Sequence, residues 1–477
     1  MKRIPGKWLV VVSLLLGTFT LILNNSMLNP AVPHLMEVFD ADAVATGWVI
    51  TIFMVSMGMT MPVTGFLGDK FGKKRLYLIG LSLFVLGSLL GSFAWDLSSL
   101  IMFRALQGIG GGIMMPLSMA LIFAAFPRNE RGLATGTWGV AAMVAPTIGP
   151  TLGGTIIELA SWPWLFLINV PFGLVALFVA WYYLKEVETD RSLQFDRYGF
   201  IFVTLGVGAI LFALGNISEF EHLTDMTNLG LIAFGVVALY VFVRIENQVA
   251  HPLLDLSILK IGAYALSIWV TALSSIGLFA GIFLVPLLVQ NVYGYDAIMT
   301  GLVFVPSALL TGVFMSIGGR LLDAGYAPQL LAAGMTVAAG GTIAMGFFTI
   351  ETAIYWVFIL MGIRGMGMGC FSMPATTAGM NAIPEAVISR GSAMNNVFRQ
   401  MFSALGIVFV SIYFEVRRAQ LFAGNGGEMQ EASLQAINEA FIIIGLLTLF
   451  SVPTGFMLGR KAKQSEQEKQ QEEEAEN

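Results

Sequence analysis

Charged side chains are scarce in this sequence. Asp, Glu, Lys and Arg make up 12% of the 477 residues, roughly half the share found in ordinary soluble domains. Hydrophobic residues make up 56%, and the mean hydropathy is +0.79. Apolar runs of about twenty residues leave too few polar side chains to cover a surface in water. The composition therefore predicts an all-α integral membrane protein with the lipid bilayer as its solvent.

Residues that build catalytic and metal sites are also scarce. The sequence has three histidines and one cysteine, Cys370, which excludes an intrachain disulfide and a cysteine-based metal site. It contains no glycine-rich phosphate loop of the Walker type, so transport driven by the chain's own ATP hydrolysis is not expected. We expect no enzyme activity, no metal and no bound cofactor. The net charge of −5 comes largely from the acidic end of the chain, and we expect no nucleic-acid partner.

Fourteen apolar runs, each about long enough to cross a bilayer as a helix, follow one another along the chain. They lie at approximately 8–28, 45–64, 76–95, 98–124, 133–157, 163–184, 198–217, 228–244, 264–288, 299–317, 329–350, 354–378, 392–414 and 437–458. With the amino end inside, Arg104, Arg364 and Arg399 fall within runs, and Arg417 and Arg418 fall in an outside connection. All the other lysines and arginines are then cytoplasmic, which is the positive-inside pattern. We therefore predict a multi-pass protein with both termini in the cytoplasm.

An internal repeat divides the fourteen runs. The string Gly65-Phe-Leu-Gly-Asp69 after the second run recurs as Gly319-Arg-Leu-Leu-Asp323 after the tenth, and Arg131-Gly132 recurs as Arg390-Gly391 at a similar offset. This repeat indicates two pseudo-symmetric six-helix halves, which are typical of alternating-access transporters. The predicted organisation is an N-terminal half at 1–190, an inserted two-helix hairpin at 191–260, a C-terminal half at 261–460 and a disordered acidic cytoplasmic tail at 461–477.

The loop between the second and third runs reads Gly65-Phe-Leu-Gly-Asp69-Lys-Phe-Gly72-Lys73-Lys74-Arg75. Its glycines allow a tight turn, Asp69 can accept hydrogen bonds from a facing helix end, and the basic cluster holds the loop at the cytoplasmic face. The loop resembles the signature loop of the major facilitator superfamily. The resemblance implies a latch that holds one conformation and does not touch the substrate. The expected latch residues are Gly65, Asp69, Gly72, Lys73, Lys74 and Arg75.

A second resemblance lies in the fifth run. Its glycines permit close helix packing and its prolines bend the helix, and together they resemble the antiporter motif of exporters in the same superfamily. The expected motif residues are Gly139, Pro146, Gly149, Pro150, Gly153 and Gly154. The segment 162–173 resembles the fourteen-helix branch, with Pro163 standing where many members have a basic residue.

Nearly the whole chain is thus similar to the fourteen-helix drug:proton antiporters of the EmrB/QacA type. The resemblance implies a bacterial protein of the cytoplasmic membrane. The sequence does not determine its oligomeric state, and we expect a monomer. The resemblance also implies export of small lipophilic or cationic drug-like compounds by alternating access, driven by the proton gradient and without a cofactor. One residue departs from the family pattern, because Asn24 stands in the first run where relatives commonly have aspartate. Asparagine cannot carry a proton.

Arg104 in the fourth run should face the cavity or a partner, since a charge inside a span costs about 2.5–3.5 kcal/mol by insertion scales. At about 1.5 Å per residue, Arg104 and Asn24 both lie in the outer half of the bilayer. We expect the amide oxygens of Asn24 or Asn25 to hold Arg104. Proton coupling would then use another group, such as the pair His34 and Glu37, or be weak. The expected cavity or coupling residues are Asn24, Asn25, Asn29, His34, Glu37, Arg104 and Arg364.

Several alternatives stay open on the sequence alone. Asn25 and Asn29, one helical turn apart, either line the cavity or only bridge neighbouring helices. The same fold could serve as a lipid or envelope-precursor flippase, which would cause lipid accumulation in a deletion strain. It could also serve as a non-transporting membrane sensor or assembly partner, which would bind ligand without flux. Fold analogy does not decide among these functions.

Overall fold

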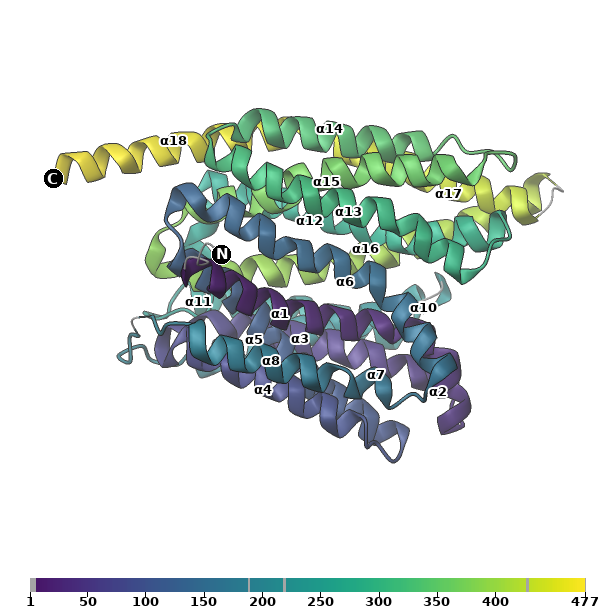
Figure 1. Ribbon diagram of the computed structural model, residues 1–477, viewed down its shortest axis with the longest axis horizontal. Helices are drawn as coiled ribbons and strands as arrows, with labels where there is room; N and C mark the ends of the chain where they lie inside the picture. The colour runs from purple at the N-terminus through teal and green to yellow at the C-terminus, as the bar shows by residue number, and fades with distance from the viewer. Residues whose placement is uncertain (1–5, 188, 218–219, 426–428, 477) are drawn as a thin grey trace, which may run out of the picture.

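The computed structural model describes residues 6–187, 189–217, 220–425 and 429–476, and they form a bundle of long helices (Figure 1). Within these ranges there is no β-strand. Thirteen helical segments are long and apolar enough to cross a membrane. The prediction of an all-α membrane protein is therefore confirmed. The expected span that is not among them is the eleventh, at 329–350; it corresponds to α14 (Ala327–Met345), which packs against α15 and α17, and its crossing of the membrane stays a prediction.

The N-terminal part contains six long helices and two short ones. Their bounds are α1 Gly6–Met27, α2 Val32–Phe39, α3 Ala43–Phe71, α4 Lys73–Gly91, α5 Leu97–Ala125, α6 Arg131–Leu159, α7 Trp164–Leu167 and α8 Asn169–Tyr183. The side chains of Asp42 and Asp96 accept hydrogen bonds from backbone N–H groups at the starts of α3 and α5, which satisfies donors that a helix start leaves free. Gly72, with φ of 101°, allows α4 to begin directly after α3 ends.

The C-terminal part forms the upper region of Figure 1. Its other helices are α12 Gly262–Pro286, which continues as the π-helical turn Leu287–Val292, then α13 Ala297–Asp323, α15 Ile354–Ala382, α16 Ile388–Asn425, α17 Met429–Phe450 and α18 Val452–Glu476. The inserted segment contributes α9 Arg197–Asn216, α10 Phe220–Thr224 and α11 Met226–Glu246.

Helices extend beyond the expected spans in two places. Helix α16 continues past 414 as far as Asn425, and α17 begins at Met429, before the expected start at 437. In the tail at 461–477, for which disorder was expected, α18 continues as far as Glu476. Both extensions have the same cause. Polar residues mark where a helix leaves the membrane, whereas Glu, Gln, Lys and Ala are themselves good helix formers and let the helix continue in water.

The helices α9 and α11 pack on each other, and α9 also contacts both α3 and α16. Ile210 and Leu214 of α9 share a buried apolar cluster with Val408 of α16. On the other side of α9, the rings of Phe212 and Trp48, which is part of α3, lie 4.5 Å apart between centroids. The inserted helices therefore touch the N-terminal and the C-terminal parts at once.

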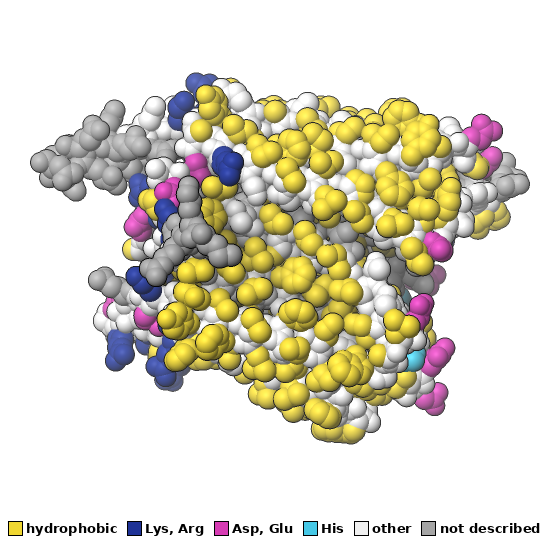
Figure 2. Space-filling model, in the orientation of Figure 1, with side chains coloured by type: hydrophobic (Ala, Val, Ile, Leu, Met, Phe, Trp, Pro, Cys, Tyr) yellow, Lys and Arg dark blue, Asp and Glu magenta, His cyan; other side chains and the backbone are white. Residues whose placement is uncertain are grey.

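Lysine and arginine side chains gather at one end of the bundle, on the left in Figure 2, and acidic side chains occur at both ends. We call this the basic end, and the opposite one the far end. The basic end is where α3 ends and where α4, α6 and α16 begin, with Lys73, Lys74, Arg75, Arg131 and Arg390. Helix α18 also leaves the bundle there (Figure 1).

The two parts meet along two helix pairs, α6 with α13 and α3 with α16. At the basic end the backbones come so close that only glycine fits. A Cβ on Gly65 would lie 2.6 Å from the carbonyl oxygen of Ser389, and a Cβ on Gly132 would overlap the carbonyl oxygen of Gly319. This close approach places the charged end of α3 against the C-terminal part and the charged end of α13 against the N-terminal part.

Candidate transport site

Arg104, on α5, is fully buried. Its Nη1 donates a hydrogen bond of 2.8 Å to Asn24 Oδ1, and its Nη2 donates one of 3.0 Å to Asn25 Oδ1. Its Nε donates to the carbonyl oxygen of Val49 on α3 at 2.9 Å. The predicted pairing of Arg104 with the amides of α1 is therefore confirmed as a contact. Among the described residues no carboxylate lies within ion-pair distance of this guanidinium, so neutral oxygens alone hold the charge.

Two residues that the sequence analysis missed complete this cluster. Gln107 accepts from Arg104 Nη1 at 2.9 Å and donates to Ser88 Oγ on α4 at 2.7 Å. The ring centroid of Phe53 lies 4.3 Å from the guanidinium carbon, which suits a cation over an aromatic face. One buried arginine thus connects α1, α3, α4 and α5. Gln107 follows Arg104 by three residues, so helical spacing could have identified it.

The polar stripe expected along the first helix is interrupted. Helix α1 ends at Met27, and Asn29 begins a 3-10 turn, so Asn25 and Asn29 do not follow one another on a single α-helix. Pro30 lacks the backbone N–H that would continue the α-helical hydrogen bonds. The side chain of Asn29 lies outside the described residues.

His34 and Glu37 lie apart from Arg104, on the short helix α2. Glu37 is exposed, and His34 is half-buried. In the part of the chain that the structure describes, no hydrogen bond or ion pair joins the two side chains. Their suggested part in proton coupling stays a proposal.

Arg364 on α15 is the second buried arginine of the expected site. Its Nη2 donates to the carbonyl oxygen of Gly277 on α12. A Cβ on Gly281, one turn further along α12, would lie 2.5 Å from its Nη1, so glycine leaves room for the guanidinium. Arg104 and Arg364 therefore use different acceptors, side-chain amides in the first case and a backbone carbonyl in the second.

Asp69, at the end of α3, forms an ion pair between the two parts of the protein. Its Oδ2 lies 3.6 Å from Nε of Arg390 at the start of α16, and its Oδ1 lies 3.2 Å from Lys73 Nζ. The connection after α8 supports this loop, because Lys70 donates to the carbonyl oxygen of Leu193 at 2.6 Å. Of the expected latch residues, Lys73 takes part in the ion pair with Asp69. Lys74 and Arg75 have no ion-pair partner among the described residues and line a groove on the outer surface instead.

Asp323 makes the corresponding contact from the C-terminal part. Its two carboxylate oxygens accept hydrogen bonds from the backbone N–H groups of Gly132 at 2.7 Å and Leu133 at 2.8 Å, at the start of α6. A carboxylate at a helix N-terminus is favoured by the helix dipole. Nearby, Arg131 donates to Glu385 at 3.1 Å, which adds a second link between the parts. The internal repeat pointed to Asp323, but not to the atoms that it binds.

The glycines of the expected antiporter motif face different neighbours. A Cβ on Gly149 would overlap the Ser26 side chain, and one on Gly153 would overlap the Met27 carbonyl oxygen, so both glycines allow α6 to lie against α1. Gly139 instead faces Met315 of α13, and Gly154 has nothing within 4 Å of its Cβ position.

The prolines of the same motif do not end α6. The helix continues through both Pro146 and Pro150 as far as Leu159. Ser26 Oγ donates to the carbonyl oxygen of Ala145 at 3.2 Å, four residues before Gly149, and so ties α1 to α6 at this contact.

The fold and the buried arginines define a multi-span membrane protein built around helix contacts between two parts. Comparison with known proteins identifies its family. The chain belongs to the Major Facilitator Superfamily, whose family model matches residues 14–407. It is therefore a transporter and not an enzyme, as the sequence predicted.

The relatives agree with this assignment. The chain is 32% identical over 460 residues to the uncharacterized MFS-type transporter YcnB of Bacillus subtilis, covering 96% of this chain and 97% of the relative. It is 30% identical to the multidrug export protein EmrB of Haemophilus influenzae, covering 86% and 81%. The predicted resemblance to the EmrB type is thus confirmed. A crystal structure of the human organic anion transporter MFSD10 (TETRAN) shares the fold, with a TM-score of 0.65 at 13% identity, covering 94% of this chain and 100% of that one.

Proposed function

We propose that the protein exports drug-like or lipophilic compounds across the bacterial cytoplasmic membrane by alternating access, in exchange for protons. In this proposal the basic end and both termini face the cytoplasm, as the positive-inside rule favours. The chain acts as a monomer of two pseudo-symmetric halves. The observation that carries the proposal is the double closure at the basic end, where Asp69 and Asp323 each bind the opposite part. Contacts of this kind hold one access state and must break to reach the other.

The export of small lipophilic or cationic compounds rests on two supports. The first is the similarity to EmrB, a protein named for multidrug export. The second is the glycine contact of α6 with α1, made by two of the residues that resemble the antiporter motif. Such a contact keeps the two helices close over the outer half of the protein and limits leakage when the basic end opens.

Proton coupling needs a group that Asn24 does not provide. Arg104 is surrounded by amides and a carbonyl, none of which titrates near neutral pH. We therefore place the coupling at His34 and Glu37 on α2, toward the far end, with no cofactor. A proton taken up there from outside would change the charge on α2. That change would shift the equilibrium between access states through α2 and the adjoining end of α1, which carries Asn24 and Asn25.

The test is a flux assay in inverted membrane vesicles, whose cytoplasmic face points outward. An imposed acid interior should drive accumulation of a cationic dye in vesicles that contain the protein, and an uncoupler should stop it. Lack of dye movement under every imposed pH difference would contradict proton exchange. Movement of a labelled phospholipid in place of the dye would favour a flippase, and dye binding without movement would favour a sensor.

Replacement of Asp69 by asparagine is expected to lower the transport rate about tenfold, with the affinity for substrate changed by less than about twofold. The substitution removes the negative charge that pairs with Lys73 at 3.2 Å and with Arg390 at 3.6 Å, and so weakens the closure between the two parts. Asp69 lies at the basic end, far from Arg104, so binding should be spared. The measurement is dye flux against dye concentration in the same vesicles.

The matched control is Glu415→Gln, which breaks an ion pair with Arg418 inside α16 and joins no two parts. This variant should transport like the parent. If Asp69→Asn also transports at the parental rate, the contact with Arg390 is not a latch.

A further inference from the structure

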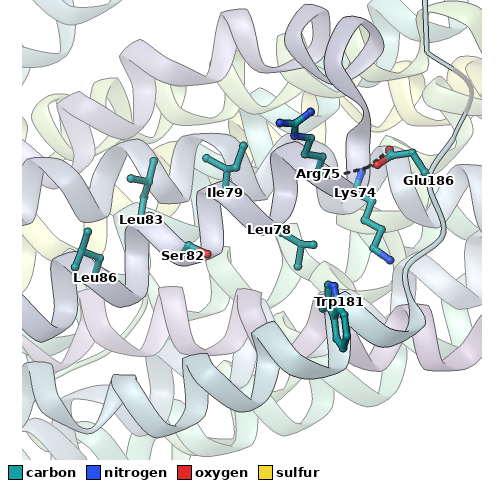
Figure 3. A pocket seen from close by; sticks show the side chains of 9 residues that line it. All are labelled: Lys74, Arg75, Leu78, Ile79, Ser82, Leu83, Leu86, Trp181 and Glu186. Atoms are coloured by element: carbon teal, nitrogen blue, oxygen red, sulfur yellow. Dashed lines mark hydrogen bonds between the residues drawn. The ribbon is translucent and has the colours of Figure 1, made fainter.

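An outward-facing groove between α4 and α8 lies at the basic end (Figure 3). It has a volume of about 450 Å³. The residues that line it are Lys74, Arg75, Leu78, Ile79, Ser82, Leu83, Leu86, Trp181 and Glu186. They form a short charged region at the start of α4 and a longer apolar region along the same helix.

The charged region carries a net positive charge. Glu186 accepts hydrogen bonds from the backbone N–H groups of Lys74 at 3.2 Å and Arg75 at 3.3 Å, and so caps the N-terminus of α4. Its carboxylate is thereby used by the helix start. The side chains of Lys74 and Arg75 have no ion-pair partner among the described residues, whereas their neighbour Lys73 is paired with Asp69. Two cations and one capping carboxylate leave one positive charge for a ligand.

The apolar region extends from the charged one along α4. Ile79 and Leu86 are 45% and 46% exposed, which in a membrane means contact with lipid tails. From Leu78 to Leu86 the helix rises about 12 Å at 1.5 Å per residue, which is enough to follow part of an acyl chain. Trp181 of α8 is 61% exposed, and Lys74 extends toward it in Figure 3. Tryptophan is enriched at the level of the lipid headgroups, so it marks that level here.

We propose that this groove binds an acidic phospholipid of the cytoplasmic leaflet. The phosphate lies beside Lys74 at the level of Trp181, Arg75 adds its positive charge at the same helix start, and one acyl chain follows the apolar side of α4 past Leu83. Basic pockets between membrane helices at the cytoplasmic face suit anionic headgroups. The inference needs the basic end to face the cytoplasm and is independent of the substrate and of the coupling ion. The proposal gives Lys74 and Arg75, at the end of the signature loop, a role separate from the latch.

The test measures lipid binding by the whole protein in nanodiscs of phosphatidylcholine to which phosphatidylglycerol is added. Thermal unfolding and native mass spectrometry report the binding. We expect phosphatidylglycerol to bind and to raise the unfolding temperature. The double variant Lys74→Gln and Arg75→Gln should bind it about thirtyfold more weakly, given the usual contribution of two basic residues at a membrane surface. Leu83→Trp, which fills the groove without changing charge, should also weaken binding.

A charge-matched control separates this groove from general attraction at the membrane surface. Lys260→Gln with Arg460→Gln removes two exposed basic residues outside the groove, and should leave binding unchanged. Equal losses in the control and the groove variant would overturn the proposal, as would unchanged binding in the groove variant. Free glycerol phosphate should not compete. If it competes as well as the lipid, the site recognises a small anion and the lipid assignment is wrong.

Discussion

Replacement of Arg104 by alanine is expected to abolish transport, to below about one-hundredth of the parental rate. The substitution removes the common donor of Asn24, Asn25, Gln107 and Val49, and so leaves several buried acceptors unpaired. Each unpaired buried group costs about 1–3 kcal/mol, so the four helices should separate or admit water. Dye flux, corrected for the amount of protein in the membrane, is the measurement.

Two further variants keep this result interpretable. Arg104→Lys retains the charge but not the planar fork that reaches three helices, and should still lose at least about tenfold. Arg244→Ala, which removes an exposed arginine whose contact is with Tyr240 on the same helix, should leave the rate unchanged. Parental flux in Arg104→Lys would show that the fork geometry is dispensable.

The variant Asn24→Asp places a titratable group beside Arg104. We expect the transport rate to depend more steeply on the imposed pH difference than in the parent. Flux is measured against the imposed pH difference for the parent, Asn24→Asp and Glu37→Gln. A parent that is already tightly coupled, with the same pH profile in both variants, would show that the coupling group lies elsewhere.

Replacement of Gly153 by valine is expected to stop transport while the protein still inserts into the membrane. A Cβ at this position would lie 3.0 Å from the carbonyl carbon of Met27 and would overlap its oxygen. Backbone atoms cannot rotate away as a side chain can, so α6 must move off α1. Overpacking of a close contact costs about 1–3 kcal/mol, and valine adds more than one methyl group. We expect flux below about a tenth of the parental value.

The neighbouring glycine provides the matched control. Gly154→Val makes the same chemical change one residue along α6, at a position with nothing within 4 Å of the added Cβ. This variant should retain most of the transport. Gly149→Val should fall between the two, because Ser26 Oγ can rotate away and the nearest atom that then remains is Ser26 Cβ at 2.7 Å, compared with 2.2 Å for the Met27 carbonyl oxygen at Gly153. Equal flux in the Gly153 and Gly154 variants would show that close contact between α1 and α6 is not needed for transport.

The Arg104 cluster was predictable because burial of a cation in a membrane strongly restricts its partners. Asn24 and Asn25 offer amide oxygens at a similar depth on the first run, and counting residues along the helices was enough to find them. Gln107 was missed although it follows Arg104 by one helical turn. The fold class followed from composition and charge distribution, which depend little on the exact helix ends.

Other features required the three-dimensional structure. The sequence presents Lys73, Lys74 and Arg75 as one basic cluster, but α4 starts within it and directs Lys73 to Asp69 and the others to the outer groove. The repeat marks Asp323 without revealing that it binds backbone N–H groups of α6, since backbone donors leave no trace in a sequence. The length of α16 was missed because its polar end continues as helix beyond the apolar run.

The position of α9 across α3 and α16 makes the two sides of the protein unequal, although its halves repeat. Rocking of the halves must move α9 relative to α3, to α16 or to both, because α9 packs on each of them. Packed there, α9 covers the contact between α3 and α16. The other contact between the parts is the direct pairing of α6 with α13. The inserted hairpin therefore adds a third element to one of the two contacts along which the parts meet.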